Sequence, residues 1–149
     1  MKQIVDNYSK NHHSFLEFQI NRNVKCTKIA GGLIDYIIHQ VIAYHHFISV
    51  INVEENSNFD SAVYHWKKSE VLPKQINKKL TLSSLSAITK IDKETVRRTV
   101  KRLSKNQWVN FTKEFGVQYS PNKENQNSMI ELAKWELDET IKWTNKLLR

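Results

Sequence analysis

Arginine and lysine side chains crowd one short segment of this 149-residue chain, between residues 93 and 105. The segment reads KETVRRTVKRLSK, and on a helical wheel its charged residues share one arc, opposite the apolar ones. Guanidinium and ammonium groups bind phosphate oxygens, and an arginine can also bond a guanine edge with two parallel hydrogen bonds. The residue types and their spacing therefore indicate a polyanionic partner, and nucleic acid in particular.

The positive charge of the chain is concentrated around this segment. The whole sequence carries 23 Lys and Arg against 15 Asp and Glu, a formal net charge of +8. The stretch from Lys74 to Lys113 holds 11 of the basic residues and 2 of the acidic ones, so the rest of the chain is close to neutral. This segregation favours a nucleic-acid interface over the alternative, a lysine-rich face that is merely solvated.

Two helical patterns separated by a short break position these side chains. Apolar residues recur at helical spacing over residues 82–88, a break follows at Ile91 and Asp92, and the pattern resumes over residues 96–103. The Asp92 carboxylate is placed to accept a hydrogen bond from the first free amides of the second helix, so we expect it to cap that helix. This order is the sequence form of a helix-turn-helix.

Short β-prone runs lie on both sides of the helix pair. Residues 79–81 suit a short strand before the first helix, and Ser83 or Ser84 is a candidate cap for that helix. After the second helix, residues 108–111 and 117–119 flank a turn and predict a β-hairpin.

The residues Glu94-Thr95-Val96-Arg97-Arg98, followed by Val100, Arg102, Leu103 and Trp108-Val109, resemble the recognition helix and first wing strand of bacterial winged-helix transcription factors. The local pattern is most similar to GntR-type regulators, whereas the size and order of elements are similar to MarR-type regulators. The resemblance implies a mainly α fold with a winged helix-turn-helix core at residues 79–120 and a small β-hairpin wing. It also implies long terminal helices that form a dimer interface.

In such proteins the second helix enters the major groove, its early residues read base edges, and the basic residues around them grip phosphates. The resemblance implies that four residues lie nearest the bases: Lys93, Glu94, Arg97 and Arg98. Arg97 is the foremost candidate among them. It also implies that three residues further along the helix contact the DNA backbone: Lys101, Arg102 and Lys105. The other candidate DNA-binding residues are Thr95, the possible caps Ser83 and Ser84, Lys90 in the turn, and Lys113 at the tip of a wing that we expect to contribute modestly.

Two positions where the family commonly has glycine hold other residues here. Lys90 occupies the turn between the two helices, and Asn106-Gln107 follows the second helix. Asparagine tolerates left-handed backbone geometry, so we expect Asn106 to end the helix without a glycine.

Helices are also expected at residues 31–52 and 128–148. The first region is too polar to span a membrane, because Asp35 and three histidines would lie in lipid, yet its apolar residues are too numerous for one stripe. Ser128 with Glu131 reads as a capping box that opens the second helix. Apolar surface on both helices, with Trp135 and Trp143 off the main stripe of the second, favours a homodimer. The alternative is that these tryptophans cover the core of a single chain.

The sequence also offers candidate residues for a ligand site and for a metal site. A cavity between the terminal helices and the DNA-binding unit is one expectation, and a filled core is the other; the candidate lining residues are Tyr36, Tyr44, Phe47 and Trp66. The spacing of His39, His45, His46, His65 and Cys26 matches no metal-ligand motif, so no metal or cofactor is expected.

The remaining composition points to a single cytoplasmic domain over residues 1–149. One cysteine excludes an intramolecular disulfide, and the polar N-terminal residues lack the apolar core of a signal peptide. Three glycines leave no phosphate-binding loop, and no nucleophile or acid–base pair stands out, so an enzyme is not expected.

The function expected from the sequence is therefore a cytoplasmic, nucleoid-associated transcriptional regulator that binds duplex DNA sequence-specifically as a homodimer. RNA polymerase is a further candidate partner, and no membrane partner is expected. Two alternatives stay open: a replication or maintenance factor that binds DNA, and a winged-helix adaptor whose basic face binds an acidic protein.

Overall fold

The computed structural model of the chain describes residues 5–51, 58–68 and 79–147. The described elements follow in the order α2 (Tyr8–Ala30), α3 (Leu33–Ile51), α4 (Phe59–Lys68), α5 (Leu82–Thr89), α6 (Lys93–Lys105), β1 (Val109–Thr112), β2 (Gly116–Tyr119) and α7 (Lys123–Leu147). The structure is mainly helical, with one small antiparallel sheet formed by β1 and β2. These elements agree with the mainly α composition and the β-hairpin that the sequence predicts.

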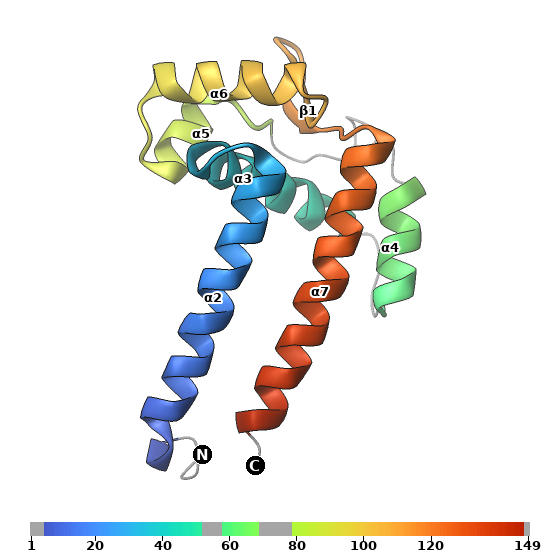
Figure 1. Cartoon of the computed structure of the whole chain (residues 1–149). Helices are drawn as coiled ribbons and strands as arrows, with labels where there is room; N and C mark the ends of the chain where they lie inside the picture. Colours follow the sequence, from blue (N-terminus) through green and yellow to red (C-terminus); the bar gives the residue numbers. More distant parts are fainter. Residues whose placement is uncertain (1–4, 52–57, 69–78, 148–149) are drawn as a thin grey trace.

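Helices α2 and α7 lie side by side and project as a long arm from the rest of the molecule (Figure 1). Helices α3, α5 and α6 and the hairpin gather at one end of this arm, and the two chain termini lie at the other end (Figure 1). Helix α2 had no counterpart among the helices expected from the sequence, because its sequence is largely polar. The arm is therefore built by pairing across the chain, since α2 packs against α7.

The contacts between α2 and α7 are largely aromatic. Phe18 stacks on Trp135 with ring centroids 6.1 Å apart, and the Lys25 Nζ atom lies 4.9 Å from the centroid of the Trp135 ring. Phe15 packs on Trp143 at 5.6 Å. Both tryptophans therefore pack within the chain, which was the alternative to their lying in a dimer interface.

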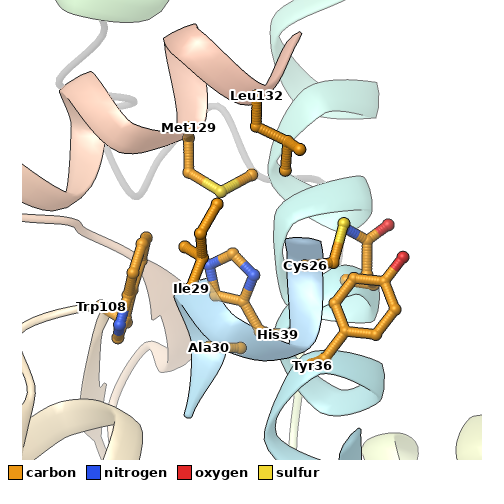
Figure 2. A pocket seen from close by; sticks show the side chains of 9 residues that line it. Cys26, Ile29, Ala30, Tyr36, His39, Trp108, Met129 and Leu132 are labelled. Atoms are coloured by element: carbon orange, nitrogen blue, oxygen red, sulfur yellow. The ribbon is translucent and has the colours of Figure 1, made fainter. Parts of the chain in front are cut away.

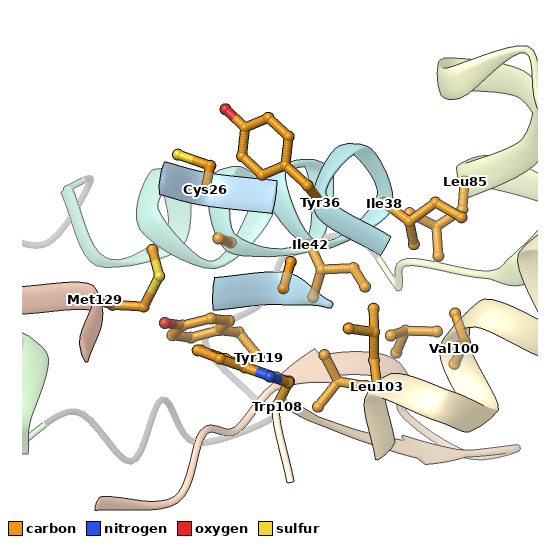
Figure 3. Close-up of a cluster of buried hydrophobic side chains, with 14 of the residues drawn as sticks. Cys26, Tyr36, Ile38, Ile42, Leu85, Val100, Leu103, Trp108, Tyr119 and Met129 are labelled. Carbon is orange, nitrogen blue, oxygen red and sulfur yellow. The ribbon is translucent and has the colours of Figure 1, made fainter. Parts of the chain in front are cut away.

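Helix α3 lies at the centre of the hydrophobic core. Its side chains Ile38 and Ile42 are almost completely buried, and they pack with residues from α5, α6 and the hairpin (Figure 3). The partners on those elements include Leu85, Val100, Leu103, Trp108 and Tyr119 (Figure 3). The 31–52 helix expected from the sequence corresponds to α3, and its excess of apolar residues is explained in part by contacts with four other elements: α2, α5, α6 and β2.

The junction between α2 and α3 is a sharp elbow at Gly31. Its φ is 92°, in the left-handed region that glycine adopts readily, and its N–H donates to the Thr27 carbonyl at 3.0 Å. Helix α3 follows at once from Leu33. The elbow directs α2 into the arm while α3 enters the core.

The C-terminal helix begins earlier than the sequence predicts. Asn122 caps α7, because its side-chain oxygen accepts a hydrogen bond from the Asn125 amide at 2.8 Å. Ser128 is inside the helix, where its hydroxyl donates to the Glu124 carbonyl. The capping-box interpretation of Ser128 is therefore wrong, and the helix expected from residue 128 begins at Lys123. An asparagine cap competes well with serine, and here it comes first in the chain.

The hairpin is held to the segment before α5 through Gly116. The strands pair in a register that places Val109 opposite Tyr119 and Thr112 opposite Gly116. Leu80 forms a parallel bridge to Gly116, and its carbonyl accepts from the Val117 amide at 2.8 Å. Gly116 has a φ of 77°, and a Cβ there would lie 2.4 Å from the Leu80 oxygen. The short extended segment predicted at residues 79–81 is thus present as a single bridge.

Candidate nucleic-acid interface

Helix α6 separates its side chains into a buried face and a basic exposed face. Val96, Thr99, Val100 and Leu103 are at most 2% exposed. The exposed side chains on the other face are Lys93, Glu94, Arg97, Arg98, Lys101, Arg102 and Lys105. Because the apolar face is anchored in the core, the basic side chains are presented by an element with a defined orientation.

Both ends of the connection between α5 and α6 are capped. Asp92 accepts a hydrogen bond from the Thr95 amide at 2.9 Å, as the sequence predicts for the start of α6. Hydrogen bonds from the Thr95 side chain and then from the Thr95 amide lower the pKa of the exposed Asp92 carboxyl. Lys90 adopts a φ of 59°, so the turn uses left-handed geometry without a glycine. The Ser86 hydroxyl supports the turn by donating to the Ile91 carbonyl at 2.6 Å.

Two helix ends in this region differ in detail from the sequence predictions. Helix α5 is capped by Thr81, whose hydroxyl oxygen accepts from the Ser84 amide at 3.0 Å, and not by Ser83 or Ser84. Helix α6 ends at Asn106 without a glycine, as the sequence predicts, but Asn106 has a φ of −84° and the left-handed conformation falls on the next residue, Gln107, with a φ of 58°. Threonine is a good cap as well, so the type of residue alone did not decide the position.

Glu94 joins the two arginines at the start of α6. Its Oε2 accepts from Arg97 Nε and its Oε1 from Arg97 Nη2, both at 2.7 Å. Oε1 also accepts from Arg98 Nε at 2.9 Å. These hydrogen bonds, first from Arg97 and then from Arg98, lower the pKa of Glu94 to about 2. The carboxylate is therefore ionised at neutral pH and neutralises part of the local positive charge.

Arg102 has an acidic partner from a distant part of the chain. Its Nε donates to Asp35 Oδ2 at 2.8 Å, and its Nη2 donates to Asp35 Oδ1 and, at 3.2 Å, to the Thr99 hydroxyl. The Asp35 side chain is 5% exposed, whereas that of Arg102 is 51% exposed. The hydrogen bond to Asp35 raises the pKa of the Arg102 guanidinium. Arg102 thus ties α6 to the first turn of α3, although the sequence suggested a contact with the DNA backbone.

The other candidate residues fall into two groups. Lys93, Lys101 and Lys105 lie with the arginines along α6, and Lys90 in the turn and Lys113 in the hairpin are also exposed. Ser84 is occupied within the molecule, because its hydroxyl shares a 2.8 Å hydrogen bond with Thr81, and Ser83 is exposed beside it. Thr95 is half-buried. Lys74, which opened the basic stretch in the sequence, lies outside the described residues.

Asp35 is the residue at this site that sequence reasoning missed. It entered only as a charge that disfavours a membrane span. The available signal was an acidic side chain near the start of a helix that is otherwise strongly apolar, since a buried carboxylate needs a partner. The sequence did not indicate which of the many basic residues would be that partner.

Two histidines of α3 are buried against the hairpin. The His39 ring lies 4.8 Å from the Trp108 ring and 5.5 Å from Tyr119, and the His46 ring lies 5.2 Å from Tyr119. Burial lowers the pKa of His39 to about 4, and burial together with the neighbouring His45 lowers that of His46 to about 4. Both imidazoles are therefore neutral at neutral pH. Within the described ranges, no group of three His, Cys, Asp or Glu side chains is arranged to hold a metal ion.

The expected cavity is divided in the structure. A pocket of about 10 Å³ lies between α2, α3 and α7, and Tyr36, His39 and Met129 line it (Figure 2). A space that small holds at most a single water molecule. A larger cavity of about 240 Å³ includes Tyr44 and Phe47 in its wall, together with Arg22 and Glu136, which form an ion pair at 2.7 Å. The fourth residue expected there, Trp66, is outside the side chains that the structure describes.

Comparison with protein-family models, with curated protein sequences and with solved structures found no match. The chain's function is therefore inferred from its own residues and geometry. None of the helices in the described ranges combines the length and apolar character that crossing a bilayer requires.

Proposed function

We propose that the protein is a transcriptional regulator that binds duplex DNA sequence-specifically, with α6 as the recognition helix of a winged helix-turn-helix. The observation that carries the proposal is the exposed face of α6. Its basic side chains outnumber the single acidic one, Glu94, while the opposite face is fixed in the core. A basic helix with a defined start and a rigid base is suited to phosphate contacts and base readout together.

The dimensions of α6 fit the proposed docking. The helix has 13 residues, about 20 Å of length at the normal rise per residue. An α-helix fits into the major groove of B-form DNA, which is about 12 Å wide. In the proposed orientation the first two turns, with Arg97 and Arg98, approach the bases, while Lys101 and Lys105 lie further along against the backbone.

The hairpin is the proposed wing. It follows α6 directly, packs on the core through Trp108, Val109, Val117 and Tyr119, and carries Lys113 in its turn. The Lys79 ammonium donates to the Lys113 carbonyl, which holds this turn against the segment before α5. We assign the wing a modest phosphate contact through Lys113, since Glu114 beside it offsets the charge.

We also propose that a second copy of the chain covers the outer faces of α2 and α7. On α2, Leu16, Ile20 and Val24 follow one another every four residues on one face and are between 46% and 62% exposed. On α7, Leu137 and Ile141 are 40% and 49% exposed. Among the described residues these side chains are left exposed, and a second arm would cover them and complete a bundle. The dimer would present two recognition helices to a pseudo-palindromic site.

Selection of duplex DNA from a random library tests the proposal. The wild type, Arg97→Ala and Arg98→Ala are compared after circular dichroism shows that all three are folded, and Lys10→Ala is the matched control. Lys10 is an exposed basic residue on α2, far along the chain from α6. We expect a two-fold-symmetric motif from the wild type and the control, and a motif that is lost or relaxed at defined positions in Arg97→Ala.

Three other outcomes would change the interpretation. Binding at low salt without any enriched motif would identify a non-specific DNA binder. Absence of DNA binding would favour an adaptor that binds an acidic protein through the same face. An enriched motif that occurs at a replication origin and not at promoters would favour a replication or maintenance factor.

A further inference from the structure

An acidic side chain, Glu94, lies at the exposed start of α6, where the phosphates of bound DNA would repel it. Glu94 lies in the first turn of α6 and its side chain is 51% exposed, so it would stand close to the phosphates in the proposed complex. A carboxylate there weakens binding to every DNA sequence alike. This cost in affinity points to a further role for Glu94, beyond the favourable position of a carboxylate at a helix N-terminus.

The hydrogen bonds of Glu94 are directed at one side of Arg97. A guanidinium group has five N–H donors in one plane, one on Nε and two on each Nη. The carboxylate takes the Nε hydrogen and one Nη2 hydrogen of Arg97, in a parallel pair with both distances at 2.7 Å. Because the group is planar, the second Nη2 hydrogen and the Nη1 hydrogens point away from the carboxylate.

The donors on that outer edge match guanine. Guanine presents two acceptors in the major groove, N7 and O6, whereas adenine presents one acceptor and one donor at the corresponding positions. Two parallel N–H groups at the end of Arg97 can satisfy both guanine acceptors, and against adenine one of them would face another donor. An arginine already held in this orientation loses less conformational entropy when it binds.

Arg98 is held less firmly than Arg97. It donates a single hydrogen bond to Glu94, at 2.9 Å, and its side chain is 72% exposed, against 54% for Arg97. One bond leaves the direction of the guanidinium group free to vary. Arg98 therefore suits a phosphate contact, which tolerates a range of directions, better than base readout.

We propose that Glu94 is a positioning residue that orients Arg97 to read one guanine in each half-site, and that Glu94 does not read a base itself. This inference rests on the proposed DNA-binding function. Arg97 reads guanine, and Glu94 provides the discrimination between guanine and the other bases. This discrimination comes at the expense of overall affinity.

The test compares Glu94→Gln with the wild type on the selected site and on its single-base variants, with random-sequence duplex as the reference. Glutamine keeps the side-chain size but offers one acceptor oxygen and no charge. Glu114→Gln is the matched control, since it removes the same charge from the exposed hairpin turn. Thermal melting followed by circular dichroism shows that each variant is folded.

We expect the wild type to prefer guanine at one position of each half-site by about tenfold or more, the scale of one good bidentate contact. In Glu94→Gln this preference should fall below about threefold, while affinity for random-sequence duplex rises. Glu114→Gln should raise the affinity for random sequence without changing the preference. In the Arg97→Ala background, Glu94→Gln should have no further effect on the preference at that position, because the two side chains act as one unit.

The results that would overturn the inference are distinct from those that would overturn the proposed function. If the wild type selects a motif and Glu94→Gln keeps its guanine preference, the positioning role is wrong and the regulator remains. If Glu94→Gln instead changes the preference at a cytosine independently of Arg97, Glu94 reads a base directly. If the wild type selects no motif, both the proposed function and this inference fail.

Discussion

Arg102 in α6 and Asp35 in α3 form an ion pair that links the exposed basic helix to the elbow between α2 and α3. The two residues are separated by 67 positions in the chain, and the Asp35 carboxylate is buried while Arg102 is half exposed. A Cβ built on Gly31, at the elbow, would lie 3.8 Å from Asp35 Oδ2, the oxygen that accepts from Arg102 Nε. The orientation of α6 is therefore coupled to the place where the helical arm leaves the core.

Removing the charge of Asp35 should destabilise the protein. In Asp35→Asn the buried side chain loses its charge and offers Arg102 one acceptor oxygen instead of two, so we expect the free energy of unfolding to fall by about 1–3 kcal/mol. Urea unfolding at neutral pH measures this difference. Asp138→Asn, an exposed acidic position on α7, is the control and should change stability by less than about 0.5 kcal/mol. Equal stability of the two variants would show that the ion pair has no structural role.

Lys101 and Arg102 should differ in how they affect DNA binding. Lys101 is exposed, so we expect Lys101→Ala to reduce the slope of log affinity against log salt by about 1. Arg102 is paired with Asp35, so Arg102→Ala should lower stability and leave that slope unchanged. Affinities measured across a series of salt concentrations decide this. A reduced slope in Arg102→Ala would show instead that Arg102 contacts a phosphate.

Mild acid should lower the stability of the protein before most of its carboxylates are titrated. The ordinary histidine pKa of 6.5 falls to about 4 for His39 and His46 in the folded chain. Between these values the unfolded chain binds more protons, so stability is full above pH 6.5 and falls as the pH drops towards 4. The loss is up to about 3 kcal/mol for each histidine, from the size of the two shifts.

Urea unfolding at several values between pH 7.5 and pH 4.5 measures this dependence. His39→Leu removes one of the titrating groups, so its stability should change less steeply over the same range. A pH dependence as steep as that of the wild type would mean that His39 is not the group responsible.

Gly116→Ala should disrupt the hairpin. The added methyl group would meet the Leu80 carbonyl at 2.4 Å in a backbone conformation with a φ of 77°. We expect a loss of about 2–3 kcal/mol in the free energy of unfolding, from strain and the weakened bridge. Gly32→Ala is the control, because a Cβ there comes no closer than 4.0 Å to its neighbours. If the two alanine variants are equally stable, the contact with Leu80 does not constrain the hairpin.

Ile20→Glu should separate the proposed dimer. The side chain is 62% exposed in the single chain, so the substitution is tolerated by the monomer but places a charge in the proposed interface. Light scattering should give the mass of a monomer, and affinity for a two-half-site duplex should fall to that for one half-site. Asn21→Glu, on another face of α2, should leave the mass of the wild type unchanged. A monomeric wild type would rule out the dimer at once.

The sequence alone determined the elements whose causes are local. The start of α6 at Asp92, its basic and apolar faces, and the hairpin after it depend on residues a few positions apart, so periodicity and capping chemistry were sufficient to predict them. Helix α3 was predicted for the same reason. Where several good caps lie close together, as with Thr81 beside Ser83, or Asn122 before Ser128, local chemistry predicted the kind of structure but not its first residue.

Only the tertiary structure decided which distant groups meet. Helix α2 is largely polar, and its place in the arm depends on the packing of Phe15 and Phe18 against Trp143 and Trp135 on α7. The role of Arg102 depends on Asp35, which no local pattern connects to it. Charge and spacing therefore indicate which side chains are available to bind a polyanion, whereas packing decides which of them are already engaged, because a buried carboxylate takes the nearest cation that the fold supplies.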